Sequence, residues 1–310
     1  MNNSKMKKLS VIILIVMMAL GAQAQVKVTP KLQKGLEAVY KSNMKLSMPG
    51  TKGDIVANSS TRYTIVGETA DGYELETMMT DFDTNVADDD VPGQLMMMSM
   101  SLIKGVKSIV LLDKNGRPIG LKNFDELHEL SAKACDQAIA KLLEKMPEIA
   151  QMLPTDMLKQ QVMESLTEKA TVDMLCNNGV LALNGRTIMT GAQEEYTNEQ
   201  GMKMKRMYLL MGTDGKKIRT SGTLNMTKDE MKQFFIDQIE ATMPDQAEAV
   251  KQNIDMLMES GMLKMDITDT TDFTLRDDQW VQTLTTNAKS NTMGQESTVE
   301  TTTEFVSGNF

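Results

Sequence analysis

Histidine, cysteine and aromatic residues are scarce in this sequence, which argues against several kinds of site. Its 310 residues include one histidine, two cysteines, one Trp, five Tyr and seven Phe. A Ser-His-Asp or Cys-His catalytic group requires a histidine, and His128 stands in the first turns of an expected helix, where a structural role is usual. A zinc site needs clustered Cys and His ligands, and these residues are not clustered. Few rings are available to stack against sugars.

Phosphate and calcium motifs are absent or incomplete. No glycine-rich loop leads into Gly-Lys-Ser/Thr. One acidic stretch begins like a calcium loop with Asp81, Asp83 and Asn85, but Val86 stands where glycine is required and Pro92 where a glutamate is required. We therefore expect no cofactor and no enzymatic activity. A hydrolase with two converging carboxylates is the weakest alternative.

Basic residues are also fewer than acidic residues. Without the first 24 residues, 33 − 3 = 30 Lys and Arg face 42 Asp and Glu, which gives a net charge of 30 − 42 = −12. A chain this acidic repels the phosphates of nucleic acids and the surface of anionic membranes. We expect neither as a partner.

A long hydrophobic run occurs only at the N-terminus. Lysines precede an apolar stretch from Leu9 to Leu20, and Ala22-Gln23-Ala24 fits a signal-peptidase cleavage site. The run is shorter than the roughly 18 residues of a membrane span, and no cysteine follows the small residues to carry a lipid anchor. The sequence predicts a signal peptide at 1–24 and a single domain at 25–310. The latter would be exported, soluble and periplasmic or extracellular, without stable membrane insertion.

The two cysteines, Cys135 and Cys176, form an even pair in a chain expected to be exported, so a disulfide is permitted. Such a bridge would stabilise the fold by roughly 4 kcal/mol through loop closure. The alternative is two buried free thiols, and no spacing rule decides between them.

Apolar periodicity and turn residues predict a mixture of strands and helices. The sequence predicts an N-terminal helix at 25–44, strands at 53–67 and 73–82, a short apolar helix at 94–106, hairpins at 170–196, and a threonine-rich C-terminal meander from 263 that keeps one face in water.

Two segments share one arrangement, a hairpin followed by a pair of helices. They cover residues 108–166 and 206–262, with hairpin turns at Gly116 and Gly215. Thr227 and Glu230 form a capping box at the start of a helix. The similarity fits either an internal duplication or two independent uses of the same turn and cap chemistry.

Methionine is unusually abundant: 30 in total and 30 − 4 = 26 after the expected signal peptide. These residues can replace leucine in a core, line an adaptable apolar cavity, or bind Cu(I) through their thioethers. The densest groups are Met96, Met97, Met98 and Met100, and Met202, Met204 and Met207.

These observations favour an α+β fold. We expect a curved, half-barrel-like antiparallel sheet, built from hairpins and the C-terminal meander and covered by helices. In outline this is similar to periplasmic half-barrel carriers that sort lipoproteins, but no motif matches that family, so no site residues are carried over.

The predicted function is an exported, non-enzymatic binding protein that holds an apolar small molecule or an envelope protein segment between sheet and helices. The alternatives are a structural or interaction module of the cell envelope and, less favoured, Cu(I) binding. The candidate ligand-binding residues are Met96, Met97, Met100, Met231, Phe234, Phe235, Ile239 and Leu257.

Overall fold

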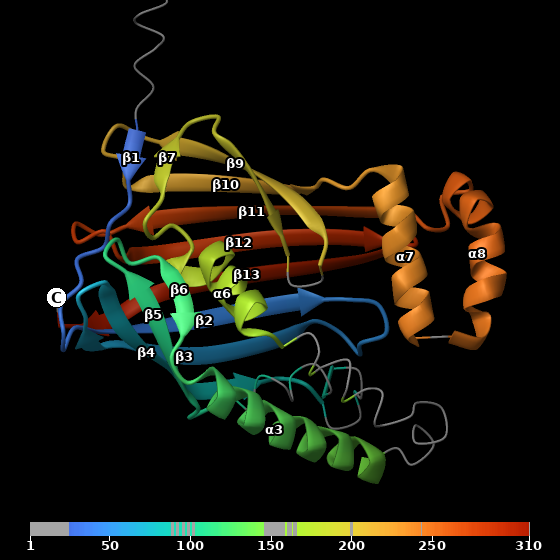
Figure 1. Ribbon diagram of the computed structural model, residues 1–310, viewed down its shortest axis with the longest axis horizontal. Coiled ribbons are helices and arrows are strands. Elements are labelled where there is room, and N and C mark those ends of the chain that lie inside the picture. The colour runs from blue at the N-terminus through green and yellow to red at the C-terminus, as the bar shows by residue number, and fades with distance from the viewer. Residues whose placement is uncertain are drawn as a thin grey trace, which may run out of the picture.

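The fold is α+β, as the sequence predicts, with one large antiparallel sheet at its centre (Figure 1). A computed structural model describes residues 25–87, 90, 93, 94, 97, 100, 103–145, 159, 163, 166–198, 201–242 and 244–309. In this part of the chain, no helix is both long enough and apolar enough to cross a membrane. The predicted signal peptide lies outside the described residues.

The sheet has 11 strands in the order β6-β5-β4-β3-β2-β13-β12-β11-β10-β9-β8. Pairing of β2 with β13, which places Tyr40 opposite Phe305, joins the N-terminal strands to the C-terminal meander. The strands are β2 (Glu37–Ser47), β3 (Ile55–Glu68), β4 (Gly72–Thr84), β5 (Lys107–Asp113), β6 (Pro118–Leu121), β8 (Gln193–Thr197), β9 (Lys203–Met211), β10 (Lys217–Leu224), β11 (Met265–Leu275), β12 (Val281–Thr292) and β13 (Gln295–Gly308).

The described residues also form four α-helices, one 3-10 helix and a two-stranded sheet. The helices α7 and α8 lie together at one end of the large sheet, and α6 lies over its middle (Figure 1). The bounds are α3 (Phe124–Lys145), α6 (Glu168–Asn177), η1 (Gly179–Leu181), α7 (Lys228–Thr242) and α8 (Pro244–Glu259), with β1 (Gln25–Lys27) paired to β7 (Thr187–Met189).

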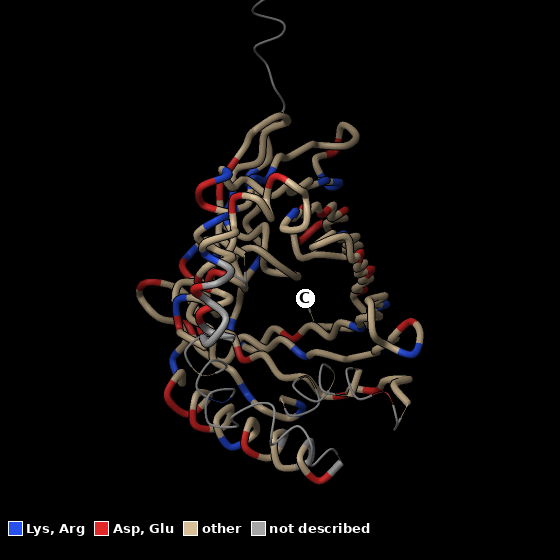
Figure 2. Tube along the Cα trace, turned by 90° about the vertical axis from the view of Figure 1, so that its right-hand side faces the viewer, with Lys and Arg blue, Asp and Glu red and all other residues tan. Residues whose placement is uncertain are grey.

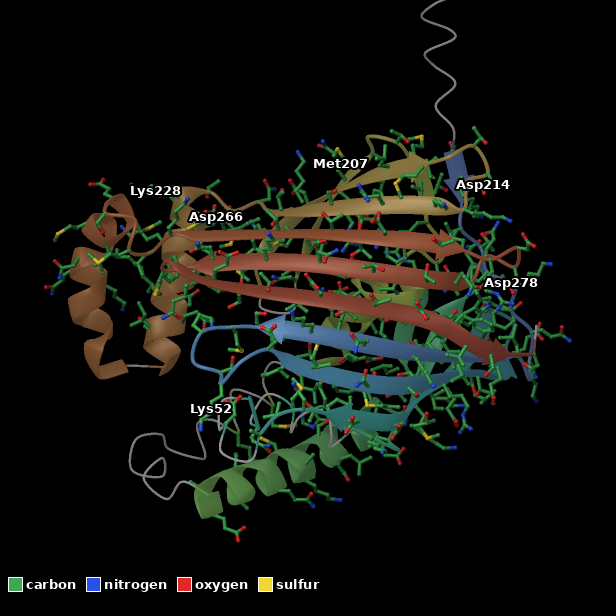
Figure 3. The ribbon with its side chains drawn as sticks, turned by 180° about the vertical axis from the view of Figure 1, so that it is seen from behind. Lys52, Met207, Asp214, Lys228, Asp266 and Asp278 are labelled. Atoms are coloured by element: carbon green, nitrogen blue, oxygen red, sulfur yellow. The ribbon has the colours of Figure 1, made fainter. Side chains whose placement is uncertain are left out.

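The two faces of the large sheet differ in character. Side chains alternate along a strand, and in β2 Ala38, Tyr40 and Leu46 are buried while Lys41 and Lys45 are exposed. We call the buried side the inner face. The helix α6 lies on it, in front of the strands in Figure 1 and behind them in Figure 3. Acidic and basic residues are interspersed along the chain (Figure 2).

Threonines are found on both faces of the sheet. The threonine-rich strands were predicted to keep their polar side in water, so the buried threonines are a correction. Thr220 and Thr303 are buried on the inner face. Some inner hydroxyls bond to each other across strands, as in Thr271 with Thr286 at 3.0 Å and Ser42 with Thr303 at 2.8 Å. Mutual hydrogen bonds satisfy these groups where water is partly excluded.

The main core lies at the end of the inner face away from α7 and α8. Residues 180–188, which follow α6, fill it: Val180, Leu181, Leu183 and Ile188 are all nearly inaccessible. They form one cluster with inner-face residues that include Tyr40, Ile65, Leu75, Val110, Ile218, Phe273 and Trp280. We call residues 176–188, which include this segment, the plug.

The predicted helix at 25–44 is wrong. The segment contains β1, an extended connection and the start of β2. Inner-face alternation of Ala38, Tyr40 and Leu46 fits a strand, and pairing with β13, some 260 residues later in the chain, decides the outcome. The segment forms a strand despite its helical spacing, because pairing with a distant strand buries its inner-face side chains.

The N-terminal segment also packs against both hairpin turns of the predicted repeat. A Cβ on Gly215 would lie 2.6 Å from Val26 Cγ2, and one on Gly116 would lie 2.9 Å from Pro30 Cγ. Both glycines have positive φ, at 67° and 82°. Each turn therefore requires glycine twice over, for its backbone and for the close approach.

We expect Gly215→Ala to destabilise the protein more than Gly212→Ala. Gly212 also has positive φ, at 82°, but the nearest atom to its Cβ would be Asp214 Oδ1 at 3.6 Å. Both alanines carry backbone strain of about 1–2 kcal/mol, so the difference isolates the clash with Val26, about 1 kcal/mol or more. Urea unfolding measures it, and equal losses would contradict the described packing.

Most other predicted elements are present. The hairpins β3–β4, β5–β6 and β9–β10, the meander β11–β12–β13 and the helices α3, α7 and α8 are confirmed. The hairpins predicted at 170–196 are not formed. The helices α6 and η1 occupy the first half, and in the second half β7 pairs with β1 and β8 with β9. The side chain of Thr167 caps α6 by accepting a hydrogen bond from Ala170 N at 3.1 Å. Packing of Val172 and Leu175 on the core outweighs the β propensity of this stretch.

The disulfide that the sequence permits is not formed. Cys135 on α3 and Cys176 at the end of α6 are both free thiols. Cys176 Sγ donates instead to Pro118 O at 3.4 Å, beneath strand β6. Burial raises the pKa of both thiols. The second helix of the first predicted repeat lies almost wholly outside the described residues, so duplication stays a prediction.

The predicted capping box at the start of α7 is confirmed. Thr227 N donates to Glu230 Oε2 at 2.9 Å, and Glu230 N donates to Thr227 Oγ1 at 3.2 Å. Lys203 from β9 also donates to Glu230. The ammonium of Lys203, followed by the hydrogen bonds of Thr227, lowers the pKa of Glu230 to about 2.

We expect Glu230 to titrate near pH 2 in a carboxyl NMR titration. Because the folded pKa lies below the unfolded value of about 4.3, the stabilising effect is complete above that value and is lost as the pH falls toward 2. Lys203→Ala should move the pKa of Glu230 upward, while the Thr227 bonds keep it below the unfolded value. A Glu230 pKa that does not respond to Lys203→Ala would contradict this assignment.

Candidate functional site

An apolar pocket of about 480 Å³ lies between α3 and the inner face of β3, β4 and β5. We call it the α3 pocket. Strand residues Thr61, Thr77 and Ser108 contribute to its lining. Apolar residues form most of its wall: Met78, Met79, Ile103, Val106, Leu121, Phe124, Leu127, Leu130, Ala134 and Leu166.

Hydrogen bonds at the ends of β5 and β6 hold α3 over this pocket. Asn123, just before the helix, accepts from Ile109 N at 2.9 Å and donates to Lys107 O at 2.9 Å. The carboxylate of Glu168, at the start of α6, accepts from Leu121 N at 2.8 Å. Phe124 and Leu127 at the start of α3 pack on the main core. The first turns of α3 are thus fixed, and the helix continues from there along the edge of the pocket.

The chemistry of the α3 pocket suits an uncharged molecule. Its polar groups are hydroxyls of Thr61, Thr77, Ser108, Ser131 and Thr171, together with Gln137 and an exposed lysine, Lys133. Hydroxyls can orient a ligand without demanding a charge, and an apolar wall favours burial of hydrocarbon. Among the lining residues that the structure describes, no acid stands paired with a base.

A second pocket, of about 750 Å³, lies under α7, and we call it the α7 pocket. Phe234 and Gln238 line it from the helix. The strands β11, β12 and β13 and the segment before β9 supply the rest: Gly201, Met202, Met265, Ile267, Ala288, Lys289, Ser290, Thr292, Ser297 and Val299.

Of the candidate ligand-binding residues, those on α7 and α8 mostly gather in one cluster. Phe235 is buried there, and Met231, Phe234 and Leu257 pack against it, together with Met202, Ile254 and Met265. Of the predicted residues that the structure describes, Phe234 alone lines one of these two pockets. Ile239 is half-buried and lies outside this cluster. These side chains therefore join α7, α8 and the sheet more than they form a cavity wall.

The predicted methionines before α3 lie in a different place. Met97 is buried against Leu46, Ile55 and Ala57, and Met100 packs on the same cluster. Met96 lies outside the described residues. The two sets of candidates thus belong to separate clusters, because Met97 and Met100 approach the strands β2 and β3 while α7 and α8 stand by β11.

The second methionine group does not form a copper site. Met202 and Met204 are buried on the inner face, but Met207 points to the outer face and is 45% exposed, as Figure 3 shows. An odd spacing along a strand puts Met207 on the opposite side from Met204. Among the described residues, His, Cys, Asp and Glu form no group that could hold a metal ion.

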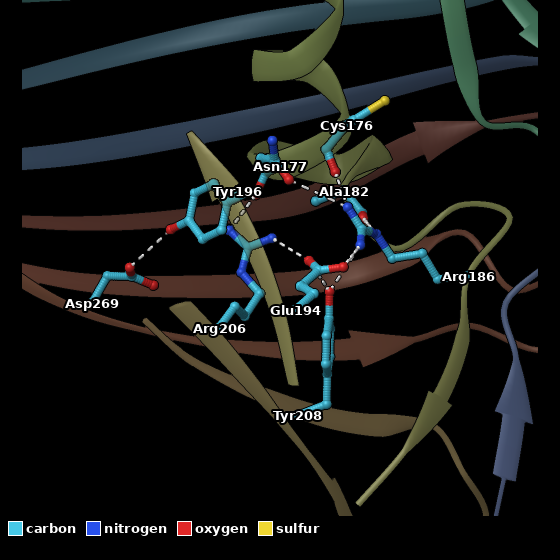
Figure 4. Close-up of polar contacts among 9 residues, drawn as sticks. All are labelled: Cys176, Asn177, Ala182, Arg186, Glu194, Tyr196, Arg206, Tyr208 and Asp269. Atoms are coloured by element: carbon cyan, nitrogen blue, oxygen red, sulfur yellow. Dashed lines mark hydrogen bonds and ion pairs between the residues drawn. The ribbon is translucent and has the colours of Figure 1, made fainter. Parts of the chain in front are cut away.

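A polar network fastens the plug to the sheet edge at β8 and β9 (Figure 4). Arg186 of the plug pairs with Glu194 of β8 and donates to Tyr208 Oη of β9 at 3.0 Å. It also donates to the backbone oxygens of Ala182 and Cys176, both at 2.8 Å. Tyr208 in turn donates to Glu194 at 2.5 Å. Burial raises the pKa of Tyr208 to about 12.

Arg206 of β9 extends the same network toward the middle of the sheet. Its Nη2 donates to Asn177 O at 2.9 Å, and its Nη1 lies 3.5 Å from Glu194 Oε1. Its guanidinium stacks on Tyr196 at 4.3 Å from the ring centroid, and Tyr196 donates to Asp269 at 3.4 Å. Burial raises the pKa of Asp269. Every charged group here has a partner from the chain, so the network is structural.

Sequence reasoning missed this network, although a signal was present. Glu194 and Tyr196 alternate on β8, and Arg206 and Tyr208 alternate on β9, so all four share the inner face. Gly222 in β10 is part of the same row: a Cβ there would lie 2.0 Å from Asp269 Oδ2. A glycine inside a strand, beside alternating charges, indicates this close approach.

Comparisons with known proteins leave the family open. No protein-family model and no curated protein matches the chain. Among solved structures, one that describes lipid-protein interactions in lipovitellin is similar to this chain, with a TM-score of 0.40 and 8% sequence identity. The match covers 90% of this chain but 26% of the lipovitellin chain, so this chain spans about a quarter of that length.

Two other solved structures match less well. A porin-like protein from Bacteroides uniformis has a TM-score of 0.19 and 9% identity, over 86% of this chain and 96% of that one. DynF from the dynemicin biosynthesis pathway of Micromonospora chersina has a TM-score of 0.19 and 7% identity, over 92% and 87%. TM-scores this low carry no argument about function.

Proposed function

We propose that this chain is an exported, non-enzymatic binding protein that holds an apolar small molecule in the α3 pocket. The observation that carries the proposal is the pocket itself. Its 480 Å³ falls within the range of about 300–1,000 Å³ typical of small-molecule sites. Its wall is built from ten apolar residues with hydroxyl residues between them. The signal-like segment at 1–24 supports export.

The non-enzymatic part of the proposal is supported by the polar network. Carboxylates and bases that could act on a substrate would need a free face toward a pocket. Instead, Glu194 accepts from Tyr208 and pairs with Arg186 and Arg206. Its oxygens are occupied by the chain, and none of these residues lines the α3 pocket.

The test is a titration of the protein with the neutral fluorophore N-phenyl-1-naphthylamine. Ala134 lines the α3 pocket from the helix, so Ala134→Trp should fill part of it and weaken binding by at least about tenfold. Ala132→Trp is the matched control, because Ala132 lies on the same helix but outside the pocket lining. Its binding should stay near that of the unaltered protein.

The site of binding can be followed separately through methionine methyl groups labelled with ¹³C. Met79 lines the α3 pocket and should shift on titration, whereas Met207 on the outer face should not. Equal binding by Ala134→Trp and Ala132→Trp, or a Met79 signal that stays fixed during saturation, would overturn the proposal.

One observation favours a second function, as an interaction module of the cell envelope. Met207 and Leu209 are 45% and 40% exposed on the outer face of β9, beside the edge strand β8. Adjacent apolar side chains next to a sheet edge suit pairing with an extended protein segment. If Met207→Lys abolished capture of an envelope protein while Ala134→Trp had no effect, this second function would replace the first.

A further inference from the structure

The α7 pocket differs from the α3 pocket in position and in chemistry. It lies between α7 and the strands β11, β12 and β13, whereas the α3 pocket is formed by β3, β4 and β5. The strand β2 separates the two sets of strands in the sheet. Each pocket lies under the helix that follows a hairpin of one predicted repeat, α3 after β5–β6 and α7 after β9–β10.

The wall of the α7 pocket has an apolar part and a hydroxyl part. Met202, Phe234 and Met265 contribute carbon and sulfur surface. Ser290 on β12 pairs directly with Ser297 on β13, so their hydroxyls stand side by side on the inner face. One side of the pocket therefore suits hydrocarbon and the other suits a group that forms hydrogen bonds.

The inner wall of this pocket carries no charged side chain among its described lining residues. Lys289 is the only charged residue that contributes to the lining. It alternates with Ala288 and Ser290 along β12, so its side chain points to the outer face, and it is exposed. A buried carboxylate or phosphate in the pocket would lack a counter-charge from the inner wall, which is costly. An uncharged polar group avoids this cost of burying a charge.

We propose that the α7 pocket is a second, separate ligand site that takes a neutral amphiphile, a molecule with a short hydrocarbon part and a hydroxyl-bearing head. The hydrocarbon lies against Met202, Phe234 and Met265, and the head bonds to Ser290 and Ser297. The site does not depend on occupancy of the α3 pocket, because the two pockets share no lining residue.

The probe is 1-octanoylglycerol, compared with octanoate, which has the same acyl chain but a charged head. In ¹³C-methyl spectra of the full chain, octanoylglycerol should shift Met202 and Met265 and leave Met207 fixed. Octanoate should bind there at least about tenfold more weakly. Replacing both serines, Ser290→Ala with Ser297→Ala, should weaken octanoylglycerol binding by about three- to tenfold.

Ala288→Trp tests the location. Ala288 lines the α7 pocket but not the α3 pocket, so this variant should lose the octanoylglycerol response at Met202 while Met79 still responds to N-phenyl-1-naphthylamine. That second response also shows that the variant is folded. If Met79 does not respond in any form of the protein while Met202 does, the proposed function fails and the second site stands. Unshifted Met202 and Met265 signals, or equal affinity for octanoate, would overturn the second site.

Discussion

Glu194→Ala is expected to lower the free energy of unfolding by about 3–5 kcal/mol, because it leaves two arginines without their carboxylate. The side chains of Arg186 and Arg206 are 13% and 6% exposed, so water would solvate them poorly after the carboxylate is removed. Arg206 Nε is already buried without a hydrogen-bond partner in the described part of the chain. Loss of Glu194 also removes the acceptor of Tyr208, so three groups are affected at once.

Glu195→Ala is the matched control. Glu195 is the next residue on β8 and points to the outer face, where it is exposed and accepts from Asn225 Nδ2 at 2.9 Å. Its loss should change stability by no more than about 0.5 kcal/mol. Urea unfolding followed by Trp280 fluorescence measures both variants. Similar small losses for the two would show that the network does not fasten the plug to the sheet.

Trp280→Ala should also cost about 3–5 kcal/mol. Trp280 is 2% exposed in the main core, and its Nε1 donates to Lys31 O at 2.9 Å. The same turn holds the N-terminal segment through its backbone, since Lys31 N donates to Asp278 O at 2.9 Å. Truncation therefore leaves a large cavity and loosens the segment that crosses the hairpin turns.

Trp280→Phe separates the two contributions. It keeps most of the ring volume but leaves Lys31 O without its indole donor, so the cost should be clearly smaller than that of Trp280→Ala, with about 1 kcal/mol from the lost bond. Because Trp280 is the single tryptophan, circular dichroism replaces fluorescence as the measure of unfolding. Equal costs for Phe and Ala would mean that packing around the ring contributes little, against its described burial.

Features that depend on local chemistry could be predicted from the sequence. The turn at Gly116 and the capping box of Thr227 and Glu230 use short-range signals, and both are where the spacing puts them. The alternation of Met202 and Met204 likewise fixes a shared face. In each case neighbouring residues alone determine the outcome.

Features that depend on distant partners could not be predicted. Leu36 and Val39 fit a helical spacing, but β2 exists because it pairs with β13 at the other end of the chain. Within the 170–196 segment, α6 and the plug take the place of hairpins because they pack on the core between distant strands. Met97 and Phe234 were predicted to share a site, yet they lie in separate clusters. Composition showed that apolar side chains were in surplus without showing which of them pack together.

The α3 pocket illustrates the same limit. Its lining combines residues from Thr61 to Thr171, and its strand residues, among them Thr61, Thr77 and Ser108, carry no distinctive motif. The sequence indicated that a ligand would lie between sheet and helices, which matches the position of both pockets. It pointed to α7 through Phe234, which lines the α7 pocket, but it did not point to α3.

The most direct test of the central claim is to extract the purified chain with organic solvent and identify what it carries by mass spectrometry. We expect an apolar molecule in near-stoichiometric amount, retained by Ala132→Trp and strongly reduced in Ala134→Trp. Protein that carries no apolar molecule and binds none when it is added, or an Ala134→Trp variant that retains the full amount, would contradict it.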